Sequence, residues 1–151
     1  MPRRSSPTAV SRAKAPAYVL DDQIGFILRQ AYQKNSLIFV GYFGDDFTPT
    51  QWAAIAKLCE TGGCSQNLLG RLTAMDAATI KGVVDRLMRR GLIESKPSAT
   101  DRRCLLITAT VAGKKAYERG VACALRASSD TLARLKPRER TVLLRLLKQM
   151  R

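Results

Sequence analysis

The residues from Asp101 to Arg103 carry the most specific side-chain chemistry in this sequence. Asp101 stands two residues before Arg103, where a carboxylate can hold the guanidinium in one orientation by a charge-assisted hydrogen bond. An arginine oriented in this way suits the narrow, electronegative minor groove of DNA. The pair can equally close the turn as a structural ion pair, and the two roles are compatible. Neighbouring residues expected to contact the DNA backbone are Lys96, Ser98, Thr100 and Arg102.

A helix expected at residues 77–90 carries the second group of candidate DNA contacts. Its buried stripe recurs every three to four residues and consists of Ile80, Val83, Val84, Leu87 and Met88. The major groove admits one α-helix, whose early exposed residues reach base edges. The candidates on this helix are Ala77, Ala78, Thr79, Lys81 and Arg86. Ser65 and Gln66, which begin the preceding helix, are expected to contact phosphates through free backbone N–H groups. The alternative is an ordinary solvated helix face.

Hydrophobic periodicity and capping residues predict the elements that position these side chains. Helices are expected at residues 20–43, 49–60, 66–72, 77–90, 111–132 and 137–150, and strands at 92–95 and 103–108. The expected N-caps are Thr48, Ser65, Asp76 and Thr110. The predicted fold class is mainly α with a small β-wing. A winged helix-turn-helix DNA-binding domain (47–109) joins a helical dimerisation region (18–46 and 110–151), after a disordered basic arm (1–17).

Apolar residues on more than one side of the outer helices predict self-association. The helix at 20–43 has apolar side chains on more than one side, so it is expected to pack on its own domain and on a partner chain. The expected stripe of the helix at 111–132 is Tyr117, Val121, Ala124, Leu125, Ser128 and Leu132. In the helix at 66–72 the residues expected to face the core are Leu68, Leu69 and Leu72. One protomer cannot easily bury the apolar stripes of its outer helices at 20–43, 111–132 and 137–150, which favours a helical homodimer.

The charge of the chain indicates a polyanionic partner. Its 151 residues carry 26 Lys and Arg against 12 Asp and Glu, a formal net charge of +14. Double-stranded DNA is the first candidate, an anionic membrane surface the second, and an inert basic surface the plain alternative. No apolar run approaches the roughly 20 residues of a membrane-spanning helix, and no apolar signal core follows the basic N-terminus. The expected location is therefore the cytoplasm, with no membrane partner.

The sequence lacks the usual marks of an enzyme or a metal site. It has no histidine, no GxSxG, no P-loop and no GxGxxG. Its four cysteines form no CxxC pair, so no metal and no cofactor are expected. In a reducing compartment Cys59, Cys64, Cys104 and Cys123 are expected to be free thiols, with a thiol-oxidation switch as an open alternative.

Several motifs in order resemble the MarR family of winged helix-turn-helix regulators. Asp101 and Arg103 match the family's Asp-x-Arg wing motif, and Thr110 and Gly113 match its Thr-x-x-Gly entry to the next helix. DRLMRRGLIES at 85–95 and FTPTQWAAIAKL at 47–58 are similar to two further family segments. The resemblance implies a dimer that binds a pseudo-palindromic operator, usually as a repressor, and is released by a small ligand or by thiol oxidation.

The trigger implied by the resemblance is a small molecule. Family members that sense organic peroxides carry a cysteine where this chain has Gly25, and family ligands are often aromatic carboxylates. We expect such an acid, or its CoA thioester, and a role in aromatic-compound catabolism. An aromatic acid needs one cation and an apolar slot. Arg29 is the candidate cation, and the candidate walls are Phe26, Tyr32, Phe39 and Trp52. These aromatics can also be plain core, and a sequence-tolerant architectural DNA binder remains the alternative function.

Overall fold

The computed structural model describes residues 17–97 and 105–151. Within them the chain order is η1 (Leu20–Asp22, a short 3-10 helix), α1 (Ile24–Phe43), α2 (Pro49–Thr61), α3 (Gln66–Leu72), α4 (Ala77–Arg89), β1 (Ile93–Pro97), β2 (Leu105–Ala109), α5 (Val111–Thr131) and α6 (Pro137–Gln149). The predicted fold class, mainly α with a small β-wing, is confirmed. None of the helices in these residues is long and apolar enough to cross a membrane.

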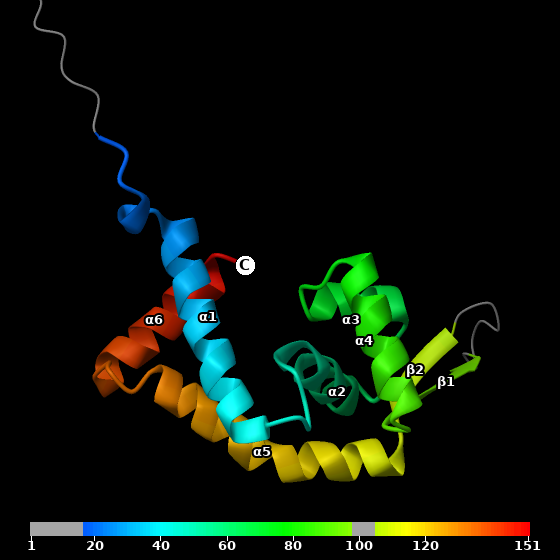
Figure 1. Cartoon of the computed structure of the whole chain (residues 1–151). Coiled ribbons are helices and arrows are strands. Elements are labelled where there is room, and N and C mark those ends of the chain that lie inside the picture. Colours follow the sequence, from blue (N-terminus) through cyan, green and yellow to red (C-terminus); the bar gives the residue numbers. More distant parts are fainter. Residues whose placement is uncertain (1–16, 98–104) are drawn as a thin grey trace, which may run out of the picture.

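The long helix α5 connects the two parts of the molecule (Figure 1). At one end it packs against α1, beside α6, and at the other it lies beneath α2 and the two-stranded sheet. Helices α3 and α4 pack on each other and on α2, so α2, α3 and α4 form one compact lobe. The elements predicted to contact DNA therefore sit on a lobe that α5 ties to the outer helices.

Side-chain caps fix where four helices begin, as the sequence predicts. Each cap oxygen accepts a hydrogen bond from a backbone N–H that has no partner within the helix. The accepting oxygens belong to Thr48 (from Gln51 N, 3.2 Å), Ser65 (from Leu68 N, 3.3 Å), Asp76 (from Thr79 N, 2.8 Å) and Thr110 (from Gly113 N, 3.0 Å). The bounds of α3 agree with the predicted range for the same reason.

The core of the lobe is the predicted stripe of α4 packed on α2 and α3. Its fully buried large side chains are Ile55, Leu58, Leu69, Ile80, Val83 and Leu87. Met88, expected at the edge of this stripe, is only partly buried. Burying an aliphatic side chain of this size stabilises the fold by about 1.5–3 kcal/mol. This packing holds the exposed face of α4 in a fixed direction.

The two-stranded sheet is anchored to the lobe by a third short stretch of backbone. β1 and β2 are antiparallel, with Ile93 opposite Ala109 and Pro97 opposite Leu105. Cys64, just before α3, exchanges two backbone hydrogen bonds with Ile107, at 3.0 and 2.9 Å. β1 begins one residue later and ends two residues later than predicted, and residues 103 and 104 of the expected second strand lie outside the described residues.

Three sequence-based expectations about helix faces and ends are wrong. α1 starts at Ile24, because the backbone of Gln23 is extended and separates it from η1. In α3 only Leu69 is fully buried, while Leu68 and Leu72 are 37% and 44% exposed. The stripe predicted for α5 is wrong in part: Tyr117 and Ala124 pack partly buried against the core, but Leu125 is 67% exposed. The buried residues of α5 are Gly113, Ala116, Gly120 and Ala127.

The physical reason for the different α5 face is close approach. A Cβ at Gly120 would lie 2.4 Å from the Trp52 ring, and one at Gly113 would lie 1.9 Å from the Leu92 carbonyl oxygen. Only glycine allows both contacts without a shift of the backbone. Small residues, together with Tyr117, whose ring stacks on that of Trp52, therefore mark the side of α5 that touches the lobe.

Candidate nucleic-acid interface

The exposed face of α4 presents the residues that the sequence predicts. Ala77, Ala78, Thr79, Lys81 and Arg86 are all exposed, opposite the buried stripe. Ser65 and Gln66 lie half-buried at the start of α3. The Ser65 hydroxyl accepts the capping bond from Leu68 N–H, so its own O–H can still donate to a phosphate beside the free backbone N–H groups.

Asp76 restricts the hydrogen bonds that the Thr79 hydroxyl can make to DNA. The Thr79 hydroxyl donates to one carboxylate oxygen of Asp76 at 2.9 Å, and the Thr79 amide donates to the other at 2.8 Å. These two hydrogen bonds lower the pKa of Asp76 below its ordinary value. With its proton already used, the Thr79 hydroxyl can only accept, so it matches base-edge donors such as the amino groups of adenine and cytosine.

Two candidate phosphate-binding lysines are paired within the protein. Lys81 lies 2.8 Å from Asp85 and Lys96 lies 2.6 Å from Glu94, and all four side chains are substantially exposed. The hydrogen bond from Lys81 lowers the pKa of Asp85. Exposed ion pairs contribute about 0–1 kcal/mol, so exchanging a carboxylate for a DNA phosphate costs little. The remaining candidates, Ser98, Thr100, Asp101, Arg102 and Arg103, lie outside the described residues.

A cavity of about 460 Å³ lies between α1, α2 and the turn from α3 to α4. It is lined by Tyr32, Asn35, Phe39, Pro49, Thr50, Trp52, Ala53, Thr73, Ala74 and Met75. Three of the five predicted ligand residues, Tyr32, Phe39 and Trp52, thus come together. Phe26 and Arg29 are not among the lining residues, and no charged side chain of the described residues is. Arg29 is exposed on α1, one helical turn before Tyr32.

Comparison with known proteins identifies the family. A MarR family model matches residues 45–103. The chain is 32% identical to NicR of Pseudomonas putida, described as an HTH-type transcriptional repressor, over 99% of this chain and 95% of that protein. The chain belongs to the MarR family. As a MarR-family protein it is a DNA-binding transcription regulator and not an enzyme, in agreement with the sequence-based prediction.

Two solved structures show how far the likeness extends. A probable transcriptional regulator from Pseudomonas aeruginosa is 51% identical, with a TM-score of 0.84, covering 88% of this chain and 100% of that one. BpsR of Bordetella bronchiseptica, whose DNA binding is regulated by 6-hydroxynicotinic acid, is 33% identical with a TM-score of 0.85 and coverages of 89% and 97%. Proteins of the MarR family bind operator DNA as dimers.

Two of the three described thiols of this MarR-family protein, Cys59 and Cys64, sit in protected places. Burial raises the pKa of Cys59 and of Cys64, which keeps both as unreactive thiols near neutral pH. Gly25, where the peroxide-sensing members carry cysteine, is exposed in the first turn of α1, and a Cβ there would meet nothing within 4 Å. Among the described residues there is no group of three or more potential metal ligands.

Sequence reasoning missed one cluster, which we call the arginine cleft. Arg86 and Arg89 of α4 and its C-cap residue Arg90 line a cleft of about 600 Å³ together with the end of α1 and the start of α2. The sequence predicts only a DNA contact for Arg86. The spacing of three and four residues could have signalled that all three arginines share one side of the helix. The facing wall comes from a distant part of the chain, which no local pattern reveals.

Proposed function

We propose that this protein is a homodimeric repressor that leaves a pseudo-palindromic operator when a small aromatic carboxylate, or its CoA thioester, binds it. The observation that carries the proposal is the composition of the cavity behind Tyr32. One wall comes from α1 and the other from the α3–α4 turn at Thr73–Met75, directly before the proposed recognition helix. A ligand bound between these walls contacts α1 and the α3–α4 turn at the same time.

The walls suit a flat aromatic molecule. Tyr32 and Trp52 offer ring surfaces, and Asn35 and Thr50 offer hydrogen-bonding groups. Asn35 already donates to Thr131 of α5 at 2.9 Å, which leaves its carbonyl oxygen for a ligand hydroxyl. The cavity lining has no cation, so we assign the ligand carboxylate to Arg29, whose exposed side chain follows the same face of α1 as Tyr32. NicR and BpsR, a repressor and a protein regulated by 6-hydroxynicotinic acid, support the choice of ligand class.

The proposed release of the protein from DNA depends on the distance between the two recognition helices of the dimer. A dimer that reads two half-sites needs its recognition helices about 34 Å apart, one helical turn of DNA. A ligand wedged between α1 and the α3–α4 turn changes the angle between the proposed dimerisation region (18–46 and 110–151) and the DNA-binding domain (47–109). The exposed apolar side chains of α1 and α6 are the proposed dimer surface, among them Ile24, Ile27, Val142, Leu146 and Met150.

The test is a gel shift on the DNA upstream of the protein's own gene, titrated with 6-hydroxynicotinate and with benzoate. We expect release by at least one of these acids, and Arg29→Ala should need at least about tenfold more of it, the cost of one charge-assisted hydrogen bond. Lys34→Ala, an exposed cation on the same helix, is the matched control and should respond as the wild type does. Release of Arg29→Ala at the wild-type concentration would refute the role of Arg29.

A second arm of the experiment tests the DNA contacts. Arg103→Ala should weaken operator binding by about 1–3 kcal/mol if it reads the minor groove. Lys81→Ala should weaken binding to all sequences and reduce the salt dependence by about one counterion. Equal affinity for the upstream DNA and for random DNA at matched salt would favour an architectural DNA binder and contradict the proposal.

A further inference from the structure

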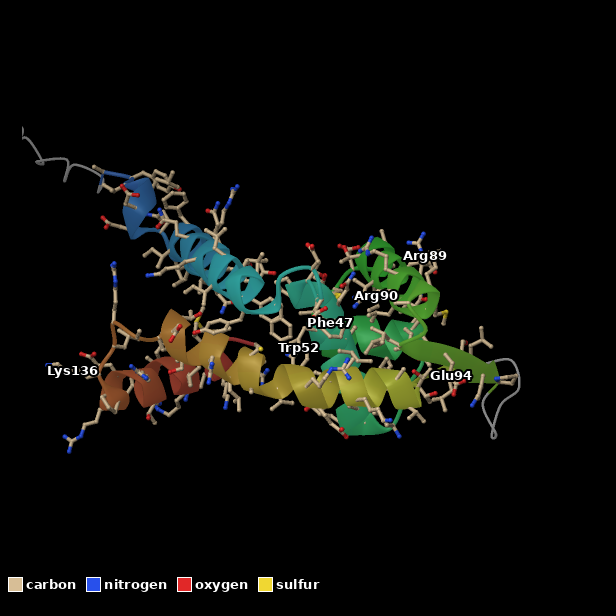
Figure 2. The ribbon with its side chains drawn as sticks, turned by 60° about the horizontal axis from the view of Figure 1, so that its bottom comes forward. Phe47, Trp52, Arg89, Arg90, Glu94 and Lys136 are labelled. Atoms are coloured by element: carbon tan, nitrogen blue, oxygen red, sulfur yellow. The ribbon has the colours of Figure 1, made fainter. Side chains whose placement is uncertain are left out.

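The arginine cleft plays no part in the proposed release mechanism and shares no lining residue with the aromatic cavity. The two lie on different sides of the first turn of α2. The cleft uses Thr48 and Gln51, and the aromatic cavity uses Pro49, Thr50 and Trp52. The remaining residues of the arginine cleft are Val40, Gly44, Asp45, Phe47, Arg86, Arg89 and Arg90. Figure 2 shows Phe47, Arg90 and Arg89 in that order from the α1–α2 turn toward α4.

The charge of the cleft is unbalanced. Three arginines line it, and Asp45 is the single acidic residue among its lining residues. Within residues 17–97 and 105–151, the ion pairs formed involve Lys57, Lys81 and Lys96, and none involves the arginines of the cleft. Like charges held in one concave site repel each other, so an anion that enters it is stabilised.

One wall of the cleft is already rigid. The Arg90 guanidinium lies over the Phe47 ring, 5.1 Å from its centroid, and donates to the Gln51 side-chain oxygen at 3.4 Å. Gln51 is itself buried, with 7% of its surface exposed, and its oxygen also accepts from the Thr48 backbone N–H at 3.2 Å. An arginine held in this way loses little freedom when it binds a ligand, which favours affinity.

We propose that the arginine cleft binds a free small molecule through a phosphate or pyrophosphate group. Guanidinium forks match phosphate oxygens in bidentate pairs, and the three arginines that line the cleft favour a compact, strongly charged group. Because Val40 and Gly44 belong to the end of α1 and its exit, and the arginines to α4, the anion joins the outer helices to the recognition helix. The cleft is thus a second ligand-binding site of the regulator, separate from the proposed site of the aromatic ligand.

The test uses the full-length protein without DNA, titrated with sodium pyrophosphate in a phosphate-free, low-salt buffer. Calorimetry and thermal unfolding follow binding, and sodium chloride at matched ionic strength corrects for screening. We expect saturable binding of one pyrophosphate per protomer, with a raised melting temperature. Arg89→Gln and Arg90→Gln should each weaken it about tenfold, which corresponds to one charge-assisted bond. Arg138→Gln, an exposed arginine of α6, removes the same charge elsewhere and should bind as the wild type does.

Each other outcome overturns the proposal. If Arg138→Gln weakens binding equally, or sodium chloride reproduces the stabilisation, only general charge screening is at work. Arg90→Gln can also disturb the packing on Phe47, so the decisive variant is Arg89→Gln, which has no such contact. If folded Arg89→Gln binds pyrophosphate as tightly as the wild type does, the proposed site is refuted. If pyrophosphate does not saturate while Arg89→Gln lowers the salt slope of DNA binding by about one, the arginines contact the DNA backbone instead. None of these results depends on the aromatic ligand.

Discussion

Replacing Gly113 with alanine tests how tightly α5 is held against the end of α4 and the start of the wing. Thr110 ties three segments together at this point. Its hydroxyl donates to the Gly91 carbonyl at 2.8 Å and accepts from the Gly113 N–H at 3.0 Å, while its own N–H donates to the Leu92 carbonyl at 3.0 Å. A Cβ at Gly113 would lie 1.9 Å from that same Leu92 oxygen, so it cannot be accommodated without separating the segments.

The expected loss of stability is about 2 kcal/mol. An ordinary carbon–oxygen contact is about 3.3 Å or longer, so α5 must move by more than about 1 Å. Overpacking of this kind costs about 1–3 kcal/mol, and losing the backbone bond from Thr110 to Leu92 adds about 0.5–1.5 kcal/mol. Alanine is the better helix former by about 1 kcal/mol, which offsets part of this loss.

Urea unfolding followed by circular dichroism is the assay, at one fixed protein concentration because the protein is a proposed dimer. With a slope of about 1–3 kcal/mol per molar urea, the Gly113→Ala midpoint should fall by about 1 M. Gly82→Ala is the matched control in α4, since a Cβ there meets only the Arg86 guanidinium, at 3.6 Å or more. Its midpoint should stay the same or rise. If the midpoint of Gly113→Ala rises in the same way, the close approach to Leu92 is not a constraint.

Three further predictions concern ionisation, thiol protection and association. Hydrogen bonds from Thr79 lower the pKa of Asp76, so the stability that Asp76 contributes is complete above the unfolded-state pKa of about 3.9 and is lost as pH falls through the lower folded-state value. The Asp76→Asn variant should therefore lose less stability than the wild type between about pH 5 and pH 2. Parallel profiles of stability against pH for the two proteins would contradict this. Burial raises the pKa of Cys59 and Cys64. A variant that keeps only these two cysteines should therefore react with a disulfide reagent at least about tenfold more slowly in its native state than when unfolded in urea. Equal reaction rates in the two states would show that the two thiols are not protected. Leu146 is 46% exposed on α6, and Leu146→Asp should shift the protein toward monomer in sedimentation velocity, whereas an intact dimer would place the interface elsewhere.

The elements of the lobe were predictable because their causes lie close together in the chain. Thr48, Ser65, Asp76 and Thr110 each cap a helix through an N–H three residues further on. The buried stripe of α4 repeats within one helix, so periodicity alone identifies it. The Thr110 to Gly113 spacing likewise pointed to the family, although only the Leu92 carbonyl explains why the last of these residues is glycine.

What the sequence could not decide depends on contacts between distant segments. The inner face of α5 is set by the approach of Trp52 and Leu92, which requires glycine and alanine beside the expected Tyr117. Packing also brings Tyr32 and Trp52 to one cavity while it leaves Arg29 outside the lining. The arginine cleft has the same origin, because α4 supplies its charges and only the tertiary structure brings Phe47 and Gln51 opposite them. Residue type and spacing determined the family and the buried stripe of the helix proposed to read DNA, whereas cavities are spaces between elements and exist only once those elements have packed.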